Sequence, residues 1–495
     1  MTSQNESAVP REKPPHVIII MADQLRADFI GEHTPNIRAL MEDGTSFSRA
    51  YCASPLCVPS RGAFFTGRTP NRNGSLINPW RKQDEAHGYV RPEIPTLYSL
   101  MEERWDSWHA GKQHLYQKGK LDEDPSSGTH WLGARKMQDY GEFVRAAGVR
   151  PPGGAKFRGL VPEMTGGRVT HPRWYSIPAT GRYEHGFEYF FDGYINSRGI
   201  EAIEKRDRTK PFLLNLMYLA PHPPLEIPEP WYSRVEQVEL SDNVARWDTG
   251  QSPLQLYNLP GFVGAGYTRE DWREIWRVYA GLVGLLDDAV GRILERLKEE
   301  GIYDDSLILF TADHGEMLGS HCLWQKMCMY EESTHVPMSL KLPRGQRQVK
   351  TSDALVSHLD VLPTLCDFLD LDDPGDLSGV SLRGVIEGDA PLQREHIFIQ
   401  ADGNGARGNF QRCVVGKNHK LIVDLFKDEI FFELYDVIED PRESVNLAWE
   451  REDLVRPMLE TLTAEMRAGD DLLEIPGGAY ERFCTDYAEL RPERA

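Results

Sequence analysis

The sequence predicts an α/β fold with a large mixed, mainly parallel sheet sandwiched by helices, followed by a smaller α+β domain that carries an antiparallel sheet. Three observations predict it: strand-like runs that are apolar throughout, a long amphipathic helix between two of them, and a change of pattern after about residue 380. We expect a large α/β domain over residues 1–380 and a smaller C-terminal domain over residues 381–495.

The first elements are a strand and a short helix. Residues 16–22 are apolar and β-branched, and they lie between prolines and polar residues. This is typical of a strand buried on both faces of a parallel sheet. Residues 34–44 predict a helix, because Thr34 can cap it, Pro35 suits the first helical position and Gly44 suits its end.

Further strands of the same apolar character are predicted at 212–219, 306–311 and 338–342. Between the first two of these, residues 269–300 place apolar side chains at intervals of three and four, which predicts a long amphipathic helix. Thr268 and Asp271 resemble a capping box at its start. In such a fold the active site is expected at the carboxyl ends of the strands.

The C-terminal part predicts a hairpin over 412–424 that turns at 416–418, a strand over 429–437 and a charged helix from about 451. In the large domain, residues 145–185 are rich in Gly and Pro and show no helical or strand period, so we interpret them as a long loop. The loop is basic and is compatible either with a solvated surface or with a face for an anionic substrate. Its charged residues are Arg145, Arg150, Lys156, Arg158, Glu163, Arg168, Arg173, Arg182 and Glu184.

Composition excludes several classes of protein. Hydrophobic residues make up 40% of the 495 residues, which favours a folded chain with a sizeable core. A net charge of −20 argues against a nucleic-acid partner, because phosphates would be repelled. The odd count of seven cysteines favours a reducing compartment. Residues 1–16 are polar and no apolar run approaches the ~20 residues of a membrane span, so we expect a cytoplasmic protein with no membrane partner.

Two predicted strand ends carry oxygen-rich side chains. Asp23 and Gln24 follow the first strand, and Asp313 and His314 follow the strand over 306–311, with Glu316 close behind. Together they form a plausible divalent-cation site at one edge of the sheet. Taken singly, an Asp after a strand is more often a turn former or a helix cap.

The segment Cys57-Val-Pro-Ser-Arg61 is the most specific feature of the chain. Cys57 precedes residues that can begin a helix, and a thiol at a helix N-terminus beside Arg61 is expected to be reactive, because both favour an anion there. The alternative, a small buried cysteine, suits the other six cysteines better.

At this point the chain resembles the type I sulfatases, the formylglycine-dependent members of the alkaline phosphatase superfamily. The resemblance spans roughly residues 16–448, in the order expected for the family. Besides the segments above, the matching motifs are Thr66-Gly-Arg68, Gly111-Lys-Gln-His114, Pro221-His-Pro-Pro224, Lys326, Leu434-Tyr-Asp436 and Asn446-Leu-Ala448.

The resemblance implies a mechanism. A formylglycine-generating enzyme would oxidise Cys57 to formylglycine, whose hydrate carries two hydroxyls. One hydroxyl would attack sulfur and displace the alcohol, and the other would lose its proton and expel sulfate as the aldehyde re-forms. An unmodified thiol has no second hydroxyl with which to release the intermediate.

The resemblance also implies roles for individual residues. Lys112, Lys326 and Arg61 would stabilise the negative charge of the sulfuryl group or orient the diol. His114 would accept a proton and His222 would donate one to the leaving oxygen. His321 is a weaker candidate for substrate contact. The metal ligands would be Asp23, Gln24, Cys57, Asp313 and His314.

Two positions depart from many relatives: Gln24 replaces a second Asp, and His314 replaces an Asn. The site is therefore less negative and has one nitrogen ligand, which weakens the expectation of Ca²⁺: a single Ca²⁺ ion is still the first expectation, but Mn²⁺ and Mg²⁺ are open as alternatives. The combination of Asp23 with Gln24 and of Asp313 with His314 also resembles the phosphonate monoester hydrolases of the same superfamily. Lys112 and His114 favour the sulfatase, because those hydrolases lack the Gly-Lys-x-His segment.

The leading hypothesis is hydrolysis of a small anionic sulfate monoester, on a mono- or oligosaccharide because a charge of −20 would oppose long sulfated polymers. The alternative is a phosphonate monoester hydrolase or phosphodiesterase. A third hypothesis is a non-catalytic protein that binds sulfated ligands. The sequence is also compatible with a homo-oligomer.

Overall fold

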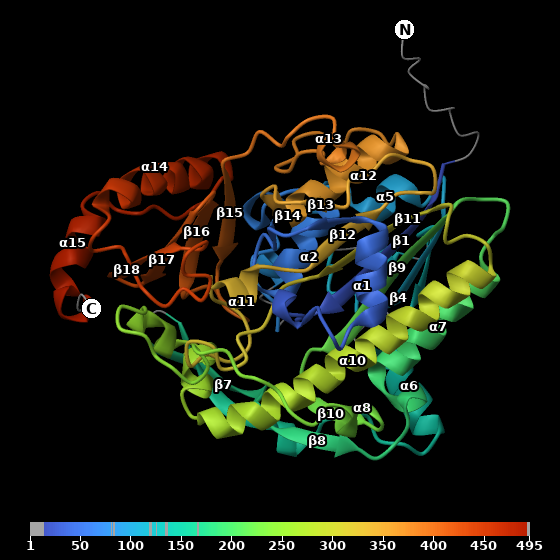
Figure 1. Ribbon diagram of the computed structural model, residues 1–495, viewed down its shortest axis with the longest axis horizontal. Helices are drawn as coiled ribbons and strands as arrows, with labels where there is room; N and C mark the ends of the chain where they lie inside the picture. Colours follow the sequence, from blue (N-terminus) through green and yellow to red (C-terminus); the bar gives the residue numbers. More distant parts are fainter. Residues whose placement is uncertain are drawn as a thin grey trace, which may run out of the picture.

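The computed structural model describes residues 14–492 except 81, 83–84, 118–120, 125, 134–136 and 166–167. Most of the polar segment 1–16 therefore lies outside the described residues. The main feature is an eight-stranded sheet with helices on both sides (Figure 1). Its strands, in spatial order, are β13 (Thr351–Ser352), β2 (Thr45–Phe47), β12 (Met338–Lys341), β11 (Ser306–Ala312), β1 (His16–Asp23), β9 (Phe212–Pro221), β4 (Asp106–Gly111) and β5 (Thr129–Leu132).

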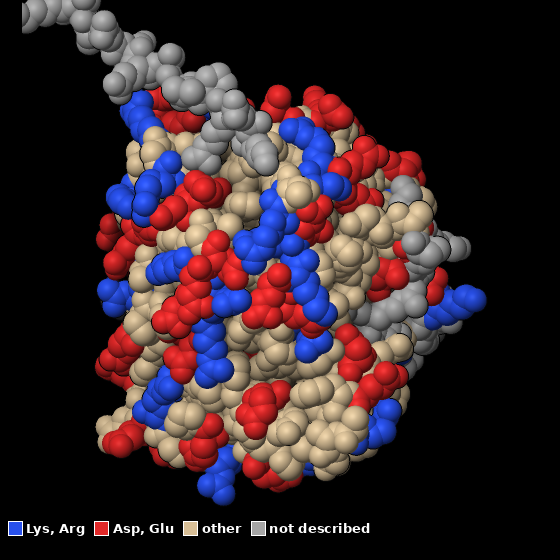
Figure 2. Space-filling view, turned by 90° about the vertical axis from the view of Figure 1, so that its right-hand side faces the viewer, with Lys and Arg blue, Asp and Glu red and all other residues tan. Residues whose placement is uncertain are grey.

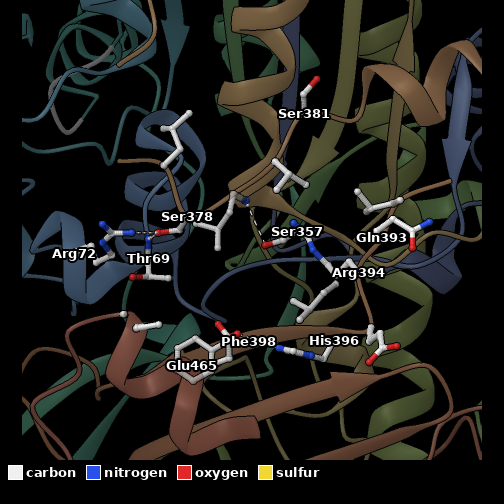
Figure 3. Close-up of a pocket in the computed structure, with 18 residues that line it drawn as sticks. Thr69, Arg72, Ser357, Ser378, Ser381, Gln393, Arg394, His396, Phe398 and Glu465 are labelled. Atoms are coloured by element: carbon white, nitrogen blue, oxygen red, sulfur yellow. Dashed lines mark hydrogen bonds and ion pairs between the residues drawn. The ribbon is translucent and has the colours of Figure 1, made fainter. Parts of the chain in front are cut away.

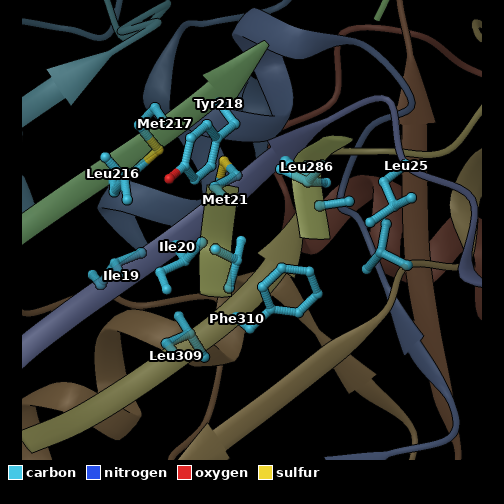
Figure 4. Packing of buried hydrophobic residues seen from close by; sticks show 14 of the residues in the cluster. Ile19, Ile20, Met21, Leu25, Leu216, Met217, Tyr218, Leu286, Leu309 and Phe310 are labelled. Atoms are coloured by element: carbon cyan, nitrogen blue, oxygen red, sulfur yellow. The ribbon is translucent and has the colours of Figure 1, made fainter. Parts of the chain in front are cut away.

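Strand β1 lies at the centre of this sheet. It runs parallel to both neighbours, with Ile20 paired to Phe310 of β11 and to Leu216 of β9. These side chains are fully buried and pack together (Figure 4). Strand β12 pairs antiparallel with β11 and with β2, so the sheet is mixed and mainly parallel, as predicted.

Helices cover both faces of the sheet. On one side α10 (Arg269–Glu299) packs with α1 (Pro35–Asp43) and α7 (Phe191–Lys205). On the other side α2 (Cys57–Thr66) packs with α5 (Leu97–Met101) and α12 (Val361–Leu369). Helix α10 starts at the predicted capping box, in which Thr268 and Asp271 cap each other's backbone. Every helix in the described part of the chain is too short or too polar to span a bilayer.

The C-terminal sheet is antiparallel, with strands β15 (His396–Ala401), β16 (Phe410–Gly416), β17 (His419–Phe426) and β18 (Glu429–Asp436) in sequence order. Helices α14 (Glu452–Ala468) and α15 (Ala479–Asp486) lie beside it (Figure 1). One face contributes Ile399 and Cys413 to a core shared with Met317 and Tyr330 of the large domain. The predicted hairpin, strand and final helix are confirmed.

The division near residue 380 stays a prediction. Leu382 and Ile386 belong to the core around the large sheet, and the small sheet begins at His396. The surface mixes charges: one face shows acidic and basic side chains interspersed (Figure 2).

The interpretation of residues 145–185 as one long loop is wrong. Strands β6 (Arg158–Thr165) and β7 (Arg168–Ser176) form an antiparallel hairpin, and β8 (Thr180–Tyr183) pairs with β10 (Leu225–Pro228). Pro162 and Pro172 are opposite each other in the backbone register of this hairpin. Proline inside a run of residues argues against a strand in a sequence-based prediction. A ribbon of two strands has only edge strands, which tolerate proline, so these strands form without the usual sequence signal.

Candidate active site

The carboxyl ends of β1 and β11 bring the two predicted acidic segments together. The backbone N–H of Asp313 donates to the carbonyl of Ala22 at 3.0 Å, and that of Gln24 donates to Oδ1 of Asp313 at 3.0 Å. Both Asp23 and Asp313 are fully buried. Parallel neighbouring strands end at the same edge of a sheet, so these residues lie close together although they are far apart in sequence.

Cys57 is the first residue of helix α2, and the start of this helix lies at the same edge of the sheet. Its Sγ lies 3.9 Å from Oδ1 of Asp23 and 3.1 Å from Nε2 of His314. Ligand atoms of Asp23, Cys57, Asp313 and His314 all lie within 4.8 Å of one another. Two buried carboxylates, an imidazole and a sulfur (or an oxygen, after oxidation) form a donor set that fits a divalent cation.

The fifth predicted ligand, Gln24, borders this group. Its side-chain oxygen accepts a hydrogen bond from Lys326, and its amide nitrogen donates to Glu316. Glu316 in turn accepts the backbone N–H of Leu318 at 3.1 Å. Gln24 is therefore oriented from both ends of its amide.

Arg61 connects the two carboxylates. Its Nη2 lies 3.0 Å from Oδ2 of Asp23 and its Nε lies 3.0 Å from Oδ2 of Asp313. Its Nη1 donates to the carbonyl oxygen of Lys112 at 2.8 Å. Burial opposes the guanidinium charge, but Asp313 and Asp23 outweigh it and raise the pKa of Arg61. Arg61 therefore contacts both carboxylates and the backbone of Lys112 at once.

Besides Lys326, which donates to Gln24, a second lysine, Lys112, lies against the same group of side chains. Lys112 donates to Asp23 and its Nζ lies 3.8 Å from Sγ of Cys57. Burial opposes its charge, but Asp23 holds the pKa of Lys112 above its ordinary value. The preceding Gly111 has φ of 103°, and a Cβ there would lie 2.1 Å from the carbonyl oxygen of Met217. Only glycine therefore lets β4 deliver Lys112 to the site.

Two histidines are held neutral near the lysines. Burial, Lys326 and Lys112 lower the pKa of His222, and burial, Lys112 and Arg61 lower that of His114. His222 donates from Nδ1 to the carbonyl of Pro223 at 2.6 Å, which leaves Nε2, 4.0 Å from Oδ1 of Asp23, as an acceptor.

Cys57 differs electrostatically from the other cysteines. Burial and Asp23 oppose its ionisation, but Lys112, Lys326 and His314 together hold the pKa of Cys57 below its ordinary value. Burial raises the pKa of each of the other six, all of which the structure describes: Cys52, Cys322, Cys328, Cys366, Cys413 and Cys484. The local field therefore favours an anion at position 57.

A cavity of about 600 Å³ opens above these residues. Its lining includes five of the predicted site residues, namely Cys57, Lys112, His114, His222 and Lys326. His321 is not part of that lining. It is fully buried, its ring stacks on Tyr330 with centroids 4.0 Å apart, and its backbone N–H donates to Asn243 at 2.9 Å. These contacts hold the loop over 313–330 in place, and they keep the buried His321 side chain away from the cavity above Cys57.

A larger cavity of about 900 Å³ lies between the large domain and the C-terminal sheet (Figure 3). Several of its charged residues are paired within the fold: Arg394 binds both carboxylate oxygens of Asp360, and Nε2 of His396 lies 3.0 Å from Glu465. It includes none of the predicted site residues. We therefore assign the chemistry to the cavity above Cys57.

Sequence reasoning missed three residues around the site. Asn78 accepts the backbone N–H of Val58 at 3.0 Å and lines the cavity. Asp192 accepts the N–H groups of Leu219 and Ala220, at 2.8 and 2.9 Å, just before His222. Asn404 reaches the cavity from the C-terminal domain. None of them stands in a local pattern that distinguishes it from a surface residue.

Comparison with known proteins gives the family. A sequence model described as Sulfatase matches residues 15–371, and one described as N-sulphoglucosamine sulphohydrolase, C-terminal, matches residues 319–468. An arylsulfatase of Clostridium perfringens is 23% identical, with 88% of this chain and 90% of the relative aligned. An N-acetylglucosamine-6-O-sulfatase of Bacteroides thetaiotaomicron is 22% identical, with 88% and 83% aligned.

Among solved structures, the phosphonate monoester hydrolase of Agrobacterium radiobacter has a TM-score of 0.73 at 22% identity and aligns over 93% of this chain and 96% of its own. At that identity the likeness concerns the fold. The family match covers most of the chain and the whole cluster around Cys57. The chain therefore belongs to the Sulfatase family and is a sulfuric ester hydrolase.

Proposed function

We propose that the protein removes sulfate from a sulfated mono- or oligosaccharide, with formylglycine at position 57 and one divalent cation. The observation that carries this proposal is the place of Cys57, at the buried start of α2, 3.1 Å from His314 and 3.8 Å from the Lys112 ammonium. A nucleophile there lies close both to the candidate cation ligands and to positive side chains.

Asp23, Gln24, Asp313, His314 and residue 57 would hold the cation, with Ca²⁺ as the first choice and Mn²⁺ or Mg²⁺ as alternatives. When bound, such an ion supplies positive charge that favours ionisation of a hydroxyl and polarises a sulfate oxygen. Formylglycine would supply that hydroxyl, and its formation requires a formylglycine-generating enzyme.

Lys112 and Lys326 would bind the sulfuryl oxygens. Both ammonium groups are almost fully buried, so they stay fixed and poorly screened while charge develops on the sulfuryl group. Arg61 would act through Asp23, Asp313 and the backbone of Lys112, which it holds in place.

The two histidines would move protons. Nδ1 of His114 is buried and makes no hydrogen bond to any described residue, so a neutral His114 is suited to accept a proton. In His222 the proton sits on Nδ1, so Nε2 must be protonated before it can donate to the leaving alcohol.

The likeness to an N-acetylglucosamine-6-O-sulfatase supports the proposal that the alcohol released from the sulfate ester is a sugar. A second candidate, phosphonate monoester hydrolysis, is favoured by one observation: the likeness in fold to a hydrolase of that name. The presence of Lys112 and His114 in the cavity lining favours the sulfatase.

The experiment is a comparison of rates on aryl sulfate, aryl phosphodiester, phosphonate monoester and a panel of sulfated sugars. Sulfate release from a sugar with the highest kcat/KM supports the proposal. A higher kcat/KM on the phosphonate ester would replace it with the second candidate. Cys57→Ala protein, purified in the same way, measures contaminating activity.

A further inference from the structure

The cavity above Cys57 is larger than a sulfate group requires. Its volume of about 600 Å³ falls in the range of pockets that enclose a whole drug-sized ligand. Beyond the proposed catalytic residues, it is lined by Trp80, by the hairpin β6–β7 and by Asn404 of the C-terminal domain. These outer residues must meet the alcohol part of the ester.

The arginines around the hairpin differ in their partners. Arg150 pairs with Glu184 and Glu226, at 2.8 and 2.7 Å, and Arg182 lies 3.8 Å from Glu229. These three glutamates neutralise two of the charges that make the segment basic, and neither arginine lines the cavity.

Arg158 and Arg173 line the cavity and form no ion pair with any carboxylate of the described residues. The guanidinium of Arg173 lies 4.4 Å from the ring centroid of Trp80. Such stacking orients a guanidinium and leaves its N–H groups available to an anion. In a chain of net charge −20, two arginines in one cavity that pair with no carboxylate among the described side chains are a local exception.

Asn404 provides a second, independent sign of a ligand. It is 9% exposed and lines the cavity, yet its Oδ1 accepts no hydrogen bond from the described residues. A buried acceptor without a donor is costly, and a ligand hydroxyl can supply one. Asn404 belongs to the loop over 402–409, between β15 and β16. Ion pairs of Asp402 with Arg407 and Arg412, at 3.0 and 2.8 Å, hold this loop in place.

The same loop packs on Trp80. Gly405 has φ of 76°, and a Cβ there would lie 1.8 Å from a carbon of the Trp80 ring. The indole therefore has the loop against it and Arg173 over its ring. Trp174, which is 60% exposed, adds an aromatic surface to the cavity lining.

We infer that the cavity contains a second anion-binding position, formed by Arg173 on Trp80 together with Arg158, while Asn404 accepts a hydrogen bond from a sugar hydroxyl. This inference rests on the proposed function and narrows its substrate: a sulfated oligosaccharide that carries another negative group besides the scissile sulfate. A carboxylate and a second sulfate share the chemistry that the arginines recognise.

The test compares three esters with the same scissile sulfate: a sugar 6-sulfate, the same sugar with a second sulfate, and the 6-sulfate linked to a uronic acid. Wild-type kcat/KM is expected to be higher for at least one doubly anionic ester, and that ester identifies the source of the second charge. Arg173→Gln should lower the ratio of doubly to singly anionic kcat/KM by roughly tenfold or more, mainly through KM, because a charge-assisted hydrogen bond is lost.

Arg182→Gln is the matched control, because it removes a neighbouring hairpin charge that does not line the cavity. Its ratio should equal that of the wild type. The inference is overturned if wild type does not prefer either doubly anionic ester, or if Arg173→Gln leaves the ratio unchanged.

A binding measurement separates this result from failure of the proposed function. Calorimetry on Cys57→Ala protein requires no turnover, and the disulfated sugar should bind more tightly than the monosulfated one, with the difference lost on adding Arg173→Gln. Equal affinities would overturn the second anion position. Absence of sulfate release from every ester, with this binding difference intact, would overturn only the proposed function.

Discussion

Sγ of Cys57 lies 3.1 Å from Nε2 of His314, although 257 residues separate them in sequence. Three backbone elements meet to create this contact: the end of β1, the end of β11 and the first turn of α2. The two strand ends supply the carboxylates of Asp23 and Asp313 and the imidazole of His314, the helix supplies the sulfur of Cys57, and these ligand atoms lie within 4.8 Å of one another.

Replacing Cys57 with Ala should abolish sulfate release, by roughly 10³-fold or more, because covalent catalysis loses its nucleophile. Steady-state rates on an aryl sulfate measure this. Cys366→Ala, in α12, is the matched control and should keep its rate. Activity of Cys57→Ala within tenfold of wild type would contradict the assigned nucleophile.

Asp313→Asn should reduce bound divalent metal below the roughly one ion per chain expected of the wild type, since it removes one of two buried carboxylates. Elemental analysis of the purified protein measures the ion. Asp305→Asn, an exposed residue just before β11, should bind as much metal as wild type. An active wild type free of divalent metal after chelation would argue against the cation.

Lys326→Gln should lower kcat on an aryl sulfate by roughly 10²–10³-fold, because a fixed cation facing the developing charge is removed. Lys350→Gln is the control: that lysine is exposed and donates to the carbonyl of Glu42 at 2.8 Å. Circular dichroism should show both variants folded. A change of less than twofold in kcat would exclude Lys326 from transition-state stabilisation.

Asp192 should make stability depend on pH. Burial raises its pKa to about 7, above the value of an unfolded Asp, so between about pH 4 and 7 the native state binds the extra proton and stability falls as pH rises. Asp192→Asn does not titrate. Its free energy of unfolding relative to wild type should therefore increase by on the order of 2 kcal/mol from pH 5 to pH 8.

Urea titrations at the two pH values measure that difference. Asp428→Asn, on the exposed turn between β17 and β18, should show no such increase. A constant difference between Asp192→Asn and wild type would mean that Asp192 is already ionised at pH 5. Because Asp192 holds the backbone before His222, the same variant also tests the support of that histidine.

The strongest predictions from sequence rest on local signals. The apolar run over 16–22 became β1, and the helix predicted over 269–300 matches α10 to within one residue. The cluster of Asp23, Cys57, Asp313 and His314 was predictable because strand ends converge on one edge of the sheet and the family motifs appear in order. The catalytic roles of these residues stay predictions.

What the sequence did not indicate depends on tertiary contact. The direction of β12 has no local signal, and it runs antiparallel to β11. The β6–β7 hairpin has a proline in each strand at paired register positions, and proline argues against a strand in a sequence-based prediction. Asn404 belongs to the C-terminal domain, and only packing against Trp80 brings its loop to the cavity. The sequence places His321 seven residues after His314, yet the fold buries its ring against Tyr330.

The central claim is that a converted Cys57 is the nucleophile, and the most direct measurement is the mass of the tryptic peptide over residues 50–61 from active protein. Fragmentation assigns any change to position 57 and separates it from Cys52 in the same peptide. We predict a mass lower by the difference between a –CH₂SH and a –CHO group. Fully active enzyme whose peptide carries an unmodified Cys57 would contradict the account.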